Sequence, residues 1–225
     1  MSYAGTIEAV SAYLYSIPDG GPLRVAVDGR TACGKSTFAR ALAGALSARG
    51  CNTLHTTIDG FHNPRSVRYA RGRLSAEGYY RDARDLGAIR RELLDPLGQG
   101  GHRSIRTGIF DLGADQPATG PAMQAPEDLF LIVDGTFLAR PELADAWDVH
   151  IFLRTSRETA RARGVTRDCL AGGAPEQVEA AYDRRYLPAF DLYLSEAGPE
   201  ASADIIVDLE DFAAPCIERM PSPRT

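Results

Sequence analysis

Residues 29–36 have types and a spacing that suit the binding of a polyphosphate. They read GRTACGKS, which matches the pattern GxxxxGK[ST]. In that pattern the glycines let successive backbone N–H groups point at phosphate oxygens, and the helix that follows presents its positive dipole end. Lys35 would reach the β- and γ-phosphates, and the Ser36 hydroxyl would bind Mg²⁺. The predicted triphosphate-binding residues are Gly29, Arg30, Thr31, Ala32, Cys33, Gly34, Lys35, Ser36 and Thr37.

The alternative for this segment is a glycine-rich turn that matches the pattern by chance. A chain of this length should contain such a match on the order of once in a hundred times. The use of lysine makes chance a weaker explanation still, because Lys35 is the only lysine among the 25 basic residues. A compact ammonium group suits β- and γ-phosphate oxygens better than a planar guanidinium does.

Two aspartates stand at the ends of predicted strands and directly before a glycine. Asp134 follows LFLIV, and Asp59 follows LHTTI. An aspartate before glycine is also typical of a turn, and that alternative stays open for both. Because parallel strands end at the same edge of a sheet, both carboxylates are predicted near the phosphate-binding segment. There Asp134 would bind Mg²⁺, and Asp59 would act as general base toward an acceptor hydroxyl.

The composition limits the classes of partner. The chain has 225 residues, of which 44% are hydrophobic, and this suits one domain with a sizeable core. Its net charge of -5 argues against nucleic acid and anionic membranes and favours a small-molecule substrate. No export signal or membrane-spanning run is evident, so a cytoplasmic location is predicted and a homo-oligomer is left open. The four cysteines lack metal-binding spacing and are interpreted as packing residues.

Hydrophobic periodicity predicts strands that alternate with helices. Strands are expected over residues 23–28, 54–59, 129–133, 149–153 and 203–209, with a weaker candidate over 103–112. Helices are expected over residues 35–49, 82–97, 156–168 and 175–194. Residues 113–126, rich in proline, alanine and glycine, are expected to connect the two halves, and residues 220–225 to form a frayed tail. The alternation predicts an α/β fold with a mostly parallel sheet and helices on both faces.

Four segments together resemble the uridine kinase branch of the P-loop kinases, whose relatives include pantothenate kinase and phosphoribulokinase. They are VDGRTACGKST, TTIDGFH, LIVDG and AAYDRRYLPAFDLYLSEAGPEASADIIVD, within about residues 23–208. The resemblance implies a three-layer P-loop fold in one domain of residues 1–225, with a substrate-binding insertion at about 62–126 and a lid at about 156–175. It also implies ATP and Mg²⁺ as cofactors.

The resemblance further implies roles for individual residues. The family's aspartate before GF serves as base and as neighbour of Mg²⁺, and this role carries over to Asp59. The carboxylate that holds the ribose hydroxyls carries over to Asp85, with Asp82 as its competitor. In the family's YDxxxH pattern, which holds the base, Phe110 keeps the aromatic position and Asp115 replaces the histidine. This replacement puts base recognition as in uridine kinases in doubt.

Arginines recur along the predicted helix of residues 156–168. Arg163 and Arg167 are predicted to lie in a lid, where arginines stabilise charge on the transferring phosphoryl group. Arg157 and Arg161 are interpreted as a solvated face. The family's further arginine after the lid has no counterpart in residues 169–175, so a shorter lid is expected.

Residues 65–84 contain six arginines interleaved with three tyrosines. They are interpreted as a loop that closes over a small polar or anionic molecule, with a merely solvated loop as the alternative. His62, close to Asp59, is a candidate contact for the acceptor. The other histidines, His55, His102 and His150, are treated as structural.

Together these residues predict an ATP-dependent kinase that phosphorylates a primary hydroxyl, with the 5′-hydroxyl of a uridine- or cytidine-like nucleoside as first choice. A pantothenate-like or sugar acceptor is the alternative, favoured by the DGFH segment and by the missing histidine after Phe110. A nucleotide-binding regulatory module without kinase activity is a second alternative. The absence of an NKxD motif argues against a GTPase.

Overall fold

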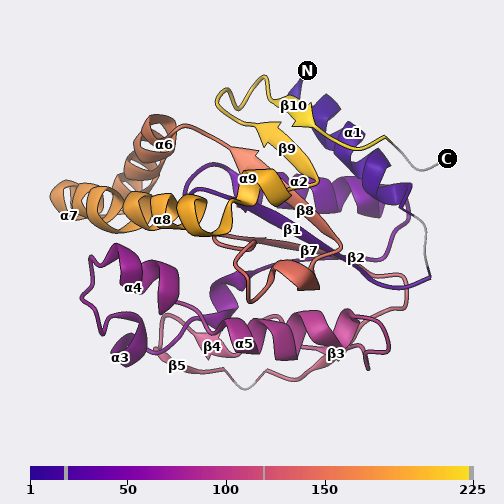
Figure 1. The fold of residues 1–225 in the computed structure, drawn as a ribbon, viewed down its shortest axis with the longest axis horizontal. Helices are drawn as coiled ribbons and strands as arrows, with labels where there is room; N and C mark the ends of the chain where they lie inside the picture. Colours follow the sequence, from indigo (N-terminus) through magenta and orange to yellow (C-terminus); the bar gives the residue numbers. More distant parts are fainter. Residues whose placement is uncertain (18–19, 119, 223–225) are drawn as a thin grey trace.

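The computed structural model describes residues 1–17, 20–118 and 120–222, and it has a central sheet with helices on both faces (Figure 1). The order of strands in the sheet is β10-β9-β8-β1-β7-β2. Their bounds are β1 (Leu23–Gly29), β2 (Thr53–Thr57), β7 (Phe130–Gly135), β8 (Val149–Arg154), β9 (Ile205–Asp208) and β10 (Cys216–Arg219). All neighbours pair in parallel except β10, which is antiparallel to β9. The predicted α/β class with a mostly parallel sheet is confirmed.

The helices that precede β7 in the chain are α1 (Tyr3–Tyr15), α2 (Lys35–Ala48), α3 (Arg65–Arg68), α4 (Ala76–Arg81) and α5 (Leu86–Ile89). A π turn (Arg90–Leu94) and a 3-10 turn (Asp95–Leu97) continue α5. After β7 come a 3-10 turn (Ala144–Ala146), α6 (Arg157–Leu170), α7 (Pro175–Ala181), a π turn (Tyr182–Tyr186), α8 (Leu187–Ala197) and α9 (Pro199–Ser202). None of the helices described in residues 1–17, 20–118 and 120–222 is long and apolar enough to cross a bilayer.

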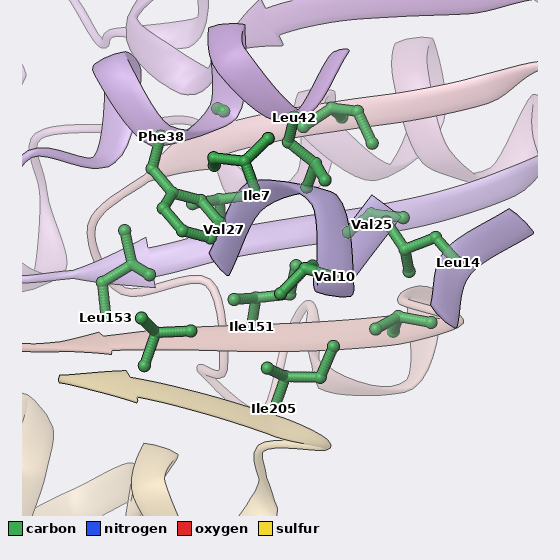
Figure 2. Packing of buried hydrophobic residues seen from close by; sticks show 14 of the residues in the cluster. Ile7, Val10, Leu14, Val25, Val27, Phe38, Leu42, Ile151, Leu153 and Ile205 are labelled. Atoms are coloured by element: carbon green, nitrogen blue, oxygen red, sulfur yellow. The ribbon is translucent and has the colours of Figure 1, made fainter. Parts of the chain in front are cut away.

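One face of the sheet packs against α1 and α2. Alternate residues of a strand point to the same face, so Val25 and Val27 of β1 share this face. Figure 2 shows Val27 on the side of Phe38 of α2 and Val25 on the side of Leu14 of α1, within one packed cluster. The other buried residues labelled there are Ile7, Val10, Leu42, Ile151, Leu153 and Ile205.

The opposite face carries the intervening residues of the same strands. Ala26, Leu131 and Val133 pack against the helical segment that begins at α5. Phe152 of β8 packs with Phe190 of α8 in a third buried cluster. Helices therefore cover both faces, and the predicted three-layer arrangement is confirmed.

Several element boundaries differ from the prediction. The second strand ends at Thr57 instead of residue 59, because a 3-10 turn (Ile58–Phe61) begins there. The helix expected from residue 82 begins at Leu86. In place of the single strand expected over residues 103–112, the structure has two short strands. Each pairs with a short strand in residues 113–126, a segment predicted to be a connection. These are β3 (Ser104–Ile105) with β6 (Met123–Gln124) and β4 (Phe110–Asp111) with β5 (Gln116–Pro117).

The two ends of the chain contain elements that the sequence analysis does not predict, α1 and β10. Of the predicted tail, residues 220–222 form neither helix nor strand, and residues 223–225 lie outside the described residues. Residues 62–126 connect β2 to β7, and α6 lies within residues 156–175. Their assignment as substrate-binding insertion and lid of a single domain stays a prediction.

Candidate active site

The phosphate-binding segment leaves the carboxyl end of β1 and enters α2 (Figure 1). Gly29 and Gly34 have φ values of 151° and 108°, which favour glycine. A Cβ at Gly29 would lie 2.6 Å from the carbonyl oxygen of Leu153, and one at Gly34 would lie 2.4 Å from the Phe212 ring. Both positions therefore exclude larger residues. The N-terminus of the 14-residue helix α2 faces the space that this segment encloses, as expected for an anion site.

A cavity of about 470 Å³ lies over this segment. Its walls come from the segment itself and from the ends of β2, β7 and α6. The lining residues are Thr31, Ala32, Gly34, Lys35, Ser36, Thr37, Arg40, Thr57, Asp59, Tyr79, Arg84, Asp134, Gly135, Thr136, Arg163 and Arg167. We call this space the phosphate cavity.

Six of the nine predicted triphosphate-binding residues line this cavity. In the described part of the chain, the other three, Gly29, Arg30 and Cys33, do not. Burial raises the pKa of the Cys33 thiol, which packs in the core. The Arg30 side chain contacts Asp191 at 3.1 Å, while its carbonyl oxygen accepts a 2.7 Å hydrogen bond from Lys35 Nζ. Lys35 would have to leave that carbonyl to reach a phosphate.

Ser36 and Asp134 lie together at the edge of the phosphate cavity. Ser36 Oγ donates a hydrogen bond of 2.6 Å to Asp134 Oδ2, and His55 Nε2 contacts Asp134 Oδ1 at 2.7 Å. A hydroxyl and a carboxylate are the oxygen ligands that Mg²⁺ prefers, and Mg²⁺ usually takes few protein ligands beside phosphates and water. The described residues hold no cluster of three or more His, Cys, Asp or Glu that could bind a metal. A site built on Ser36 and Asp134 thus fits Mg²⁺ bound with phosphates.

Asp59 stands in the 3-10 turn after β2, where its carboxylate is 58% exposed. Thr57 Oγ1 accepts a hydrogen bond from the Asp59 backbone N–H and so begins the turn. Arg84 donates a 2.7 Å hydrogen bond to Asp59 Oδ1, and its own side chain is only 8% exposed. Partial burial raises the pKa of Asp59, but the charge and hydrogen bond of Arg84 outweigh burial, so this pKa lies below the ordinary aspartate value. Asp59 is therefore ionised at neutral pH.

A second cavity, of about 220 Å³, adjoins the first. The residues that line both are Thr31, Asp59, Tyr79, Arg84 and Arg167. The residues that line only the second are His62, Arg68, Tyr69, Leu112, Asp168, Arg185 and Tyr186. This space, which we call the acceptor cavity, is bordered by residues of α3 and α4 on one side and of α6 and the π turn before α8 on the other. In Figure 1, α4 and α8 lie next to each other.

Only one of the four predicted substrate-binding residues lines the acceptor cavity in the described part of the chain. It is His62, whose Nδ1 donates a 2.7 Å hydrogen bond to the Asp59 carbonyl oxygen. Asp85 caps α5 by accepting from the backbone N–H of Ala88, and Phe110 is buried. Asp115 forms an ion pair of 2.6 Å with another residue of this region, Arg68. The competitor Asp82 pairs with Arg71 at 2.8 Å.

Both predicted lid arginines line the phosphate cavity. Arg163 donates hydrogen bonds of 2.9 Å to the carbonyl oxygens of Leu209 and Glu210, and Arg167 contacts Asp168 at 2.8 Å. The two arginines interpreted as a solvated face have side chains that are 41% and 37% exposed, and both form ion pairs. These pairs are Arg157 with Asp191 and Arg161 with Asp183.

Among the residues that the sequence analysis does not assign to the site, three bear on its charge or geometry. Arg84 was one arginine among six in its segment, and His55 was treated as structural. Arg185 lies on the π turn between α7 and α8, and no motif marks it. The sequence does offer a signal for His55. It is a polar residue in the middle of β2, the strand that pairs with β7 and so with Asp134.

A family model described as Phosphoribulokinase / Uridine kinase family matches residues 25–210. Among solved structures, a possible uridine kinase from Bacillus stearothermophilus has a TM-score of 0.71 at 20% identity, covering 90% of this chain and 97% of that one. A putative fructose transport system kinase from Silicibacter sp. TM1040 has a TM-score of 0.70 at 25% identity, covering 87% and 95%.

A D-glycerate 3-kinase from Cryptococcus neoformans var. grubii has a TM-score of 0.60 at 14% identity, covering 96% of each chain. No curated protein sequence matches the chain. The structural likenesses support the fold, and the family match spans most of the chain. The chain belongs to the phosphoribulokinase/uridine kinase family and is an ATP-dependent kinase that acts on an alcohol group.

Proposed function

We propose that this kinase transfers the γ-phosphoryl group of ATP to a primary hydroxyl of a small metabolite bound in the acceptor cavity. The observation that carries the proposal is the position of Asp59, whose side chain lines both cavities. Phosphoryl transfer requires the two reacting atoms to approach to about 3–3.5 Å. A carboxylate shared by both cavities can hold the acceptor hydroxyl opposite a phosphate bound over Lys35.

In the proposed reaction the acceptor oxygen forms a bond to the γ-phosphorus. The bond from that phosphorus to the bridging oxygen breaks, and ADP leaves with the electron pair. Asp59 accepts the hydroxyl proton and later releases it to water. Because the pKa of Asp59 is low, the carboxylate is a weak base, and its main contribution is to orient the hydroxyl while the proton moves late.

Charge on the transferring group would be balanced by Lys35, Arg163 and Arg167, which line the phosphate cavity. Ser36 and Asp134 would hold Mg²⁺, which supplies electrostatic neutralisation of the phosphates when it is bound. His55 would fix the orientation of Asp134 from behind, since it contacts the second carboxylate oxygen.

A nucleoside acceptor, predicted from the sequence, stays one candidate. It is supported by the words uridine kinase in the family description and in the Bacillus stearothermophilus structure. It is weakened by the places of Asp85, Phe110 and Asp115, which line neither cavity in the part of the chain described. A sugar acceptor is the second candidate, because the 25% identical structure is a putative fructose transport system kinase.

The substitution Asp59→Asn tests the proposal. It keeps the size of the side chain and removes the charge, so kcat should fall by about 100-fold or more, while the affinity for ATP stays within about threefold. Asp145→Asn is the matched control, because Asp145 also pairs with an arginine, Arg90, on the surface. If Asp59→Asn transfers phosphate at nearly the wild-type rate to every accepted alcohol, another group takes the proton and the assignment is wrong.

A further inference from the structure

The acceptor cavity contains one arginine, Arg185, for which the described residues provide no acidic partner. Four arginines line this cavity, and three of them form ion pairs of 2.6–2.8 Å. These pairs are Arg68 with Asp115, Arg84 with Asp59, and Arg167 with Asp168. Arg185 forms no ion pair with any carboxylate of the described residues. One positive charge in this wall therefore has no carboxylate partner in the part of the chain that the structure describes.

The surroundings of Arg185 hold its guanidinium in place without neutralising it. The group lies 4.8 Å from the ring centre of Tyr79, 5.1 Å from that of Tyr69 and 5.5 Å from that of Tyr186. Rings at these distances stabilise a cation and restrict its motion. Its Nε is buried and has no hydrogen-bond partner among the described residues. A guanidinium that is fixed, partly desolvated and without a carboxylate partner in the described part of the chain is suited to bind an anion.

Two neighbouring groups respond to the positive charges of this cavity wall. Burial raises the pKa of Tyr69, but hydrogen bonds and charge from Arg68 and Arg185 outweigh burial, so the pKa is lower than that of an ordinary tyrosine. Burial and the charges of Arg84 and Arg68 also keep the pKa of His62 below its ordinary value. The cavity wall is thus positive although the whole chain carries a net charge of -5.

We propose that the acceptor is an anionic alcohol, whose carboxylate or phosphate group is bound by Arg185 while its hydroxyl lies at Asp59. This inference rests on the proposed function and adds the chemical class of the acceptor. The cavity volume of about 220 Å³ suits a compact molecule, since sites for drug-sized ligands span roughly 300–1,000 Å³. The alternative role for Arg185 is to pack between the three tyrosines and stabilise the fold.

The first experiment asks which molecules accept phosphate. An extract of small metabolites is separated by anion exchange into a bound and an unbound fraction, and each is incubated with the protein and Mg-ATP. Mass spectrometry should find the phosphorylated product in the reaction of the bound fraction. Purified pairs then separate the two anion types: glycerate against glycerol for a carboxylate, and ribulose 5-phosphate against ribulose for a phosphate. In one of these pairs the anionic member should have a kcat/KM about tenfold or more above that of its neutral counterpart. If neither pair reacts, an acceptor purified from the bound fraction should show the same advantage over its own neutral counterpart.

The second experiment separates binding from packing. Arg185→Gln should raise KM for the anionic acceptor by about 10- to 100-fold with little change in kcat or in KM for ATP. Arg185→Lys should restore part of the affinity. Arg184→Gln is the matched control, because Arg184 is the adjacent exposed arginine and does not line the cavity. In Arg185→Gln, KM for a neutral alcohol should change far less than KM for the anionic acceptor.

Product from the unbound fraction alone would overturn the inference and leave the proposed function standing. An equal loss for neutral and anionic acceptors in Arg185→Gln would also overturn it and would assign Arg185 a packing role. ADP formation without a phosphorylated alcohol from either fraction would instead contradict the proposed function.

Discussion

Replacing Arg84 by glutamine separates the effect of this residue on activity from its effect on stability. Arg84 is 8% exposed and donates a single 2.7 Å hydrogen bond to Asp59, while its Nε and Nη1 have no partner within the described residues. Its ring contact is Tyr79, at 5.6 Å. The variant removes the charge that keeps Asp59 ionised and removes a poorly solvated cation at the same time.

The two effects have different magnitudes. A hydrogen bond to a charged group contributes about 1.5–3 kcal/mol. The lower end applies because Asp59 is 58% exposed and solvent screens the pair. A loss of about 1.5 kcal/mol in orienting Asp59 corresponds to about a tenfold fall in kcat/KM for the acceptor. The free energy of unfolding should change by less than about 1 kcal/mol, because the lost ion pair is offset by relief of desolvation.

The assay is the dependence of kcat/KM on pH, measured together with denaturant unfolding. The pKa of Asp59 lies below the ordinary value because of Arg84, so activity that needs the ionised carboxylate is lost only as the pH falls through that low pKa. In Arg84→Gln the acid limb of the profile should move to higher pH. Arg90→Gln is the control, since Arg90 pairs with the surface residue Asp145.

Two results would refute this reasoning. An acid limb that stays at the wild-type pH would mean that Arg84 does not control the charge of Asp59. A fall of more than about 3 kcal/mol in the free energy of unfolding would mean that Arg84 mainly stabilises the fold, as expected for breaking a fully buried pair.

Two further predictions concern the histidines near the site. His55→Ala removes the 2.7 Å contact with Asp134, so the Mg²⁺ concentration for half-maximal activity should rise by about tenfold; an unchanged Mg²⁺ dependence would remove His55 from the site. His62 has a lowered pKa because of burial and the charge of Arg84, so the unfolded chain binds a proton at higher pH than the folded chain does. Stability should therefore fall as the pH drops through the ordinary histidine range, and His62→Gln should flatten this slope in urea titrations. An identical slope in the variant would contradict the assignment.

Much of the fold could be predicted because its signals are local. The runs before Asp59 and Asp134 are rich in β-branched residues and mark strands. The parallel sheet then brings both aspartates to one edge, beside the segment of residues 29–36. The boundaries were less predictable. The polar residue Thr57 ends β2 early by accepting from a backbone N–H, a competition between side chain and ladder that periodicity does not reveal.

The acceptor side of the site could not be predicted, because its partners are far apart in the sequence. Asp115 has the residue type of a substrate ligand, but folding brings Arg68 to 2.6 Å from it. Arg185 is one of many arginines until the structure stacks it on tyrosines from α4 and the segment after α3. Whether an arginine is paired with a carboxylate depends on contacts between residues far apart in the sequence, and the spacing of residues in a motif does not show these contacts.

The most direct test of the central claim follows the γ-phosphoryl group itself. ATP labelled with ¹⁸O in the γ-phosphoryl group is incubated with the protein, Mg²⁺ and a metabolite extract, and the products are identified by mass spectrometry. The proposed function predicts a metabolite alcohol that gains the labelled phosphoryl group in step with the formation of ADP, and loss of that product in Asp59→Asn. Labelled inorganic phosphate as the only product, or an undiminished yield with Asp59→Asn, would contradict it.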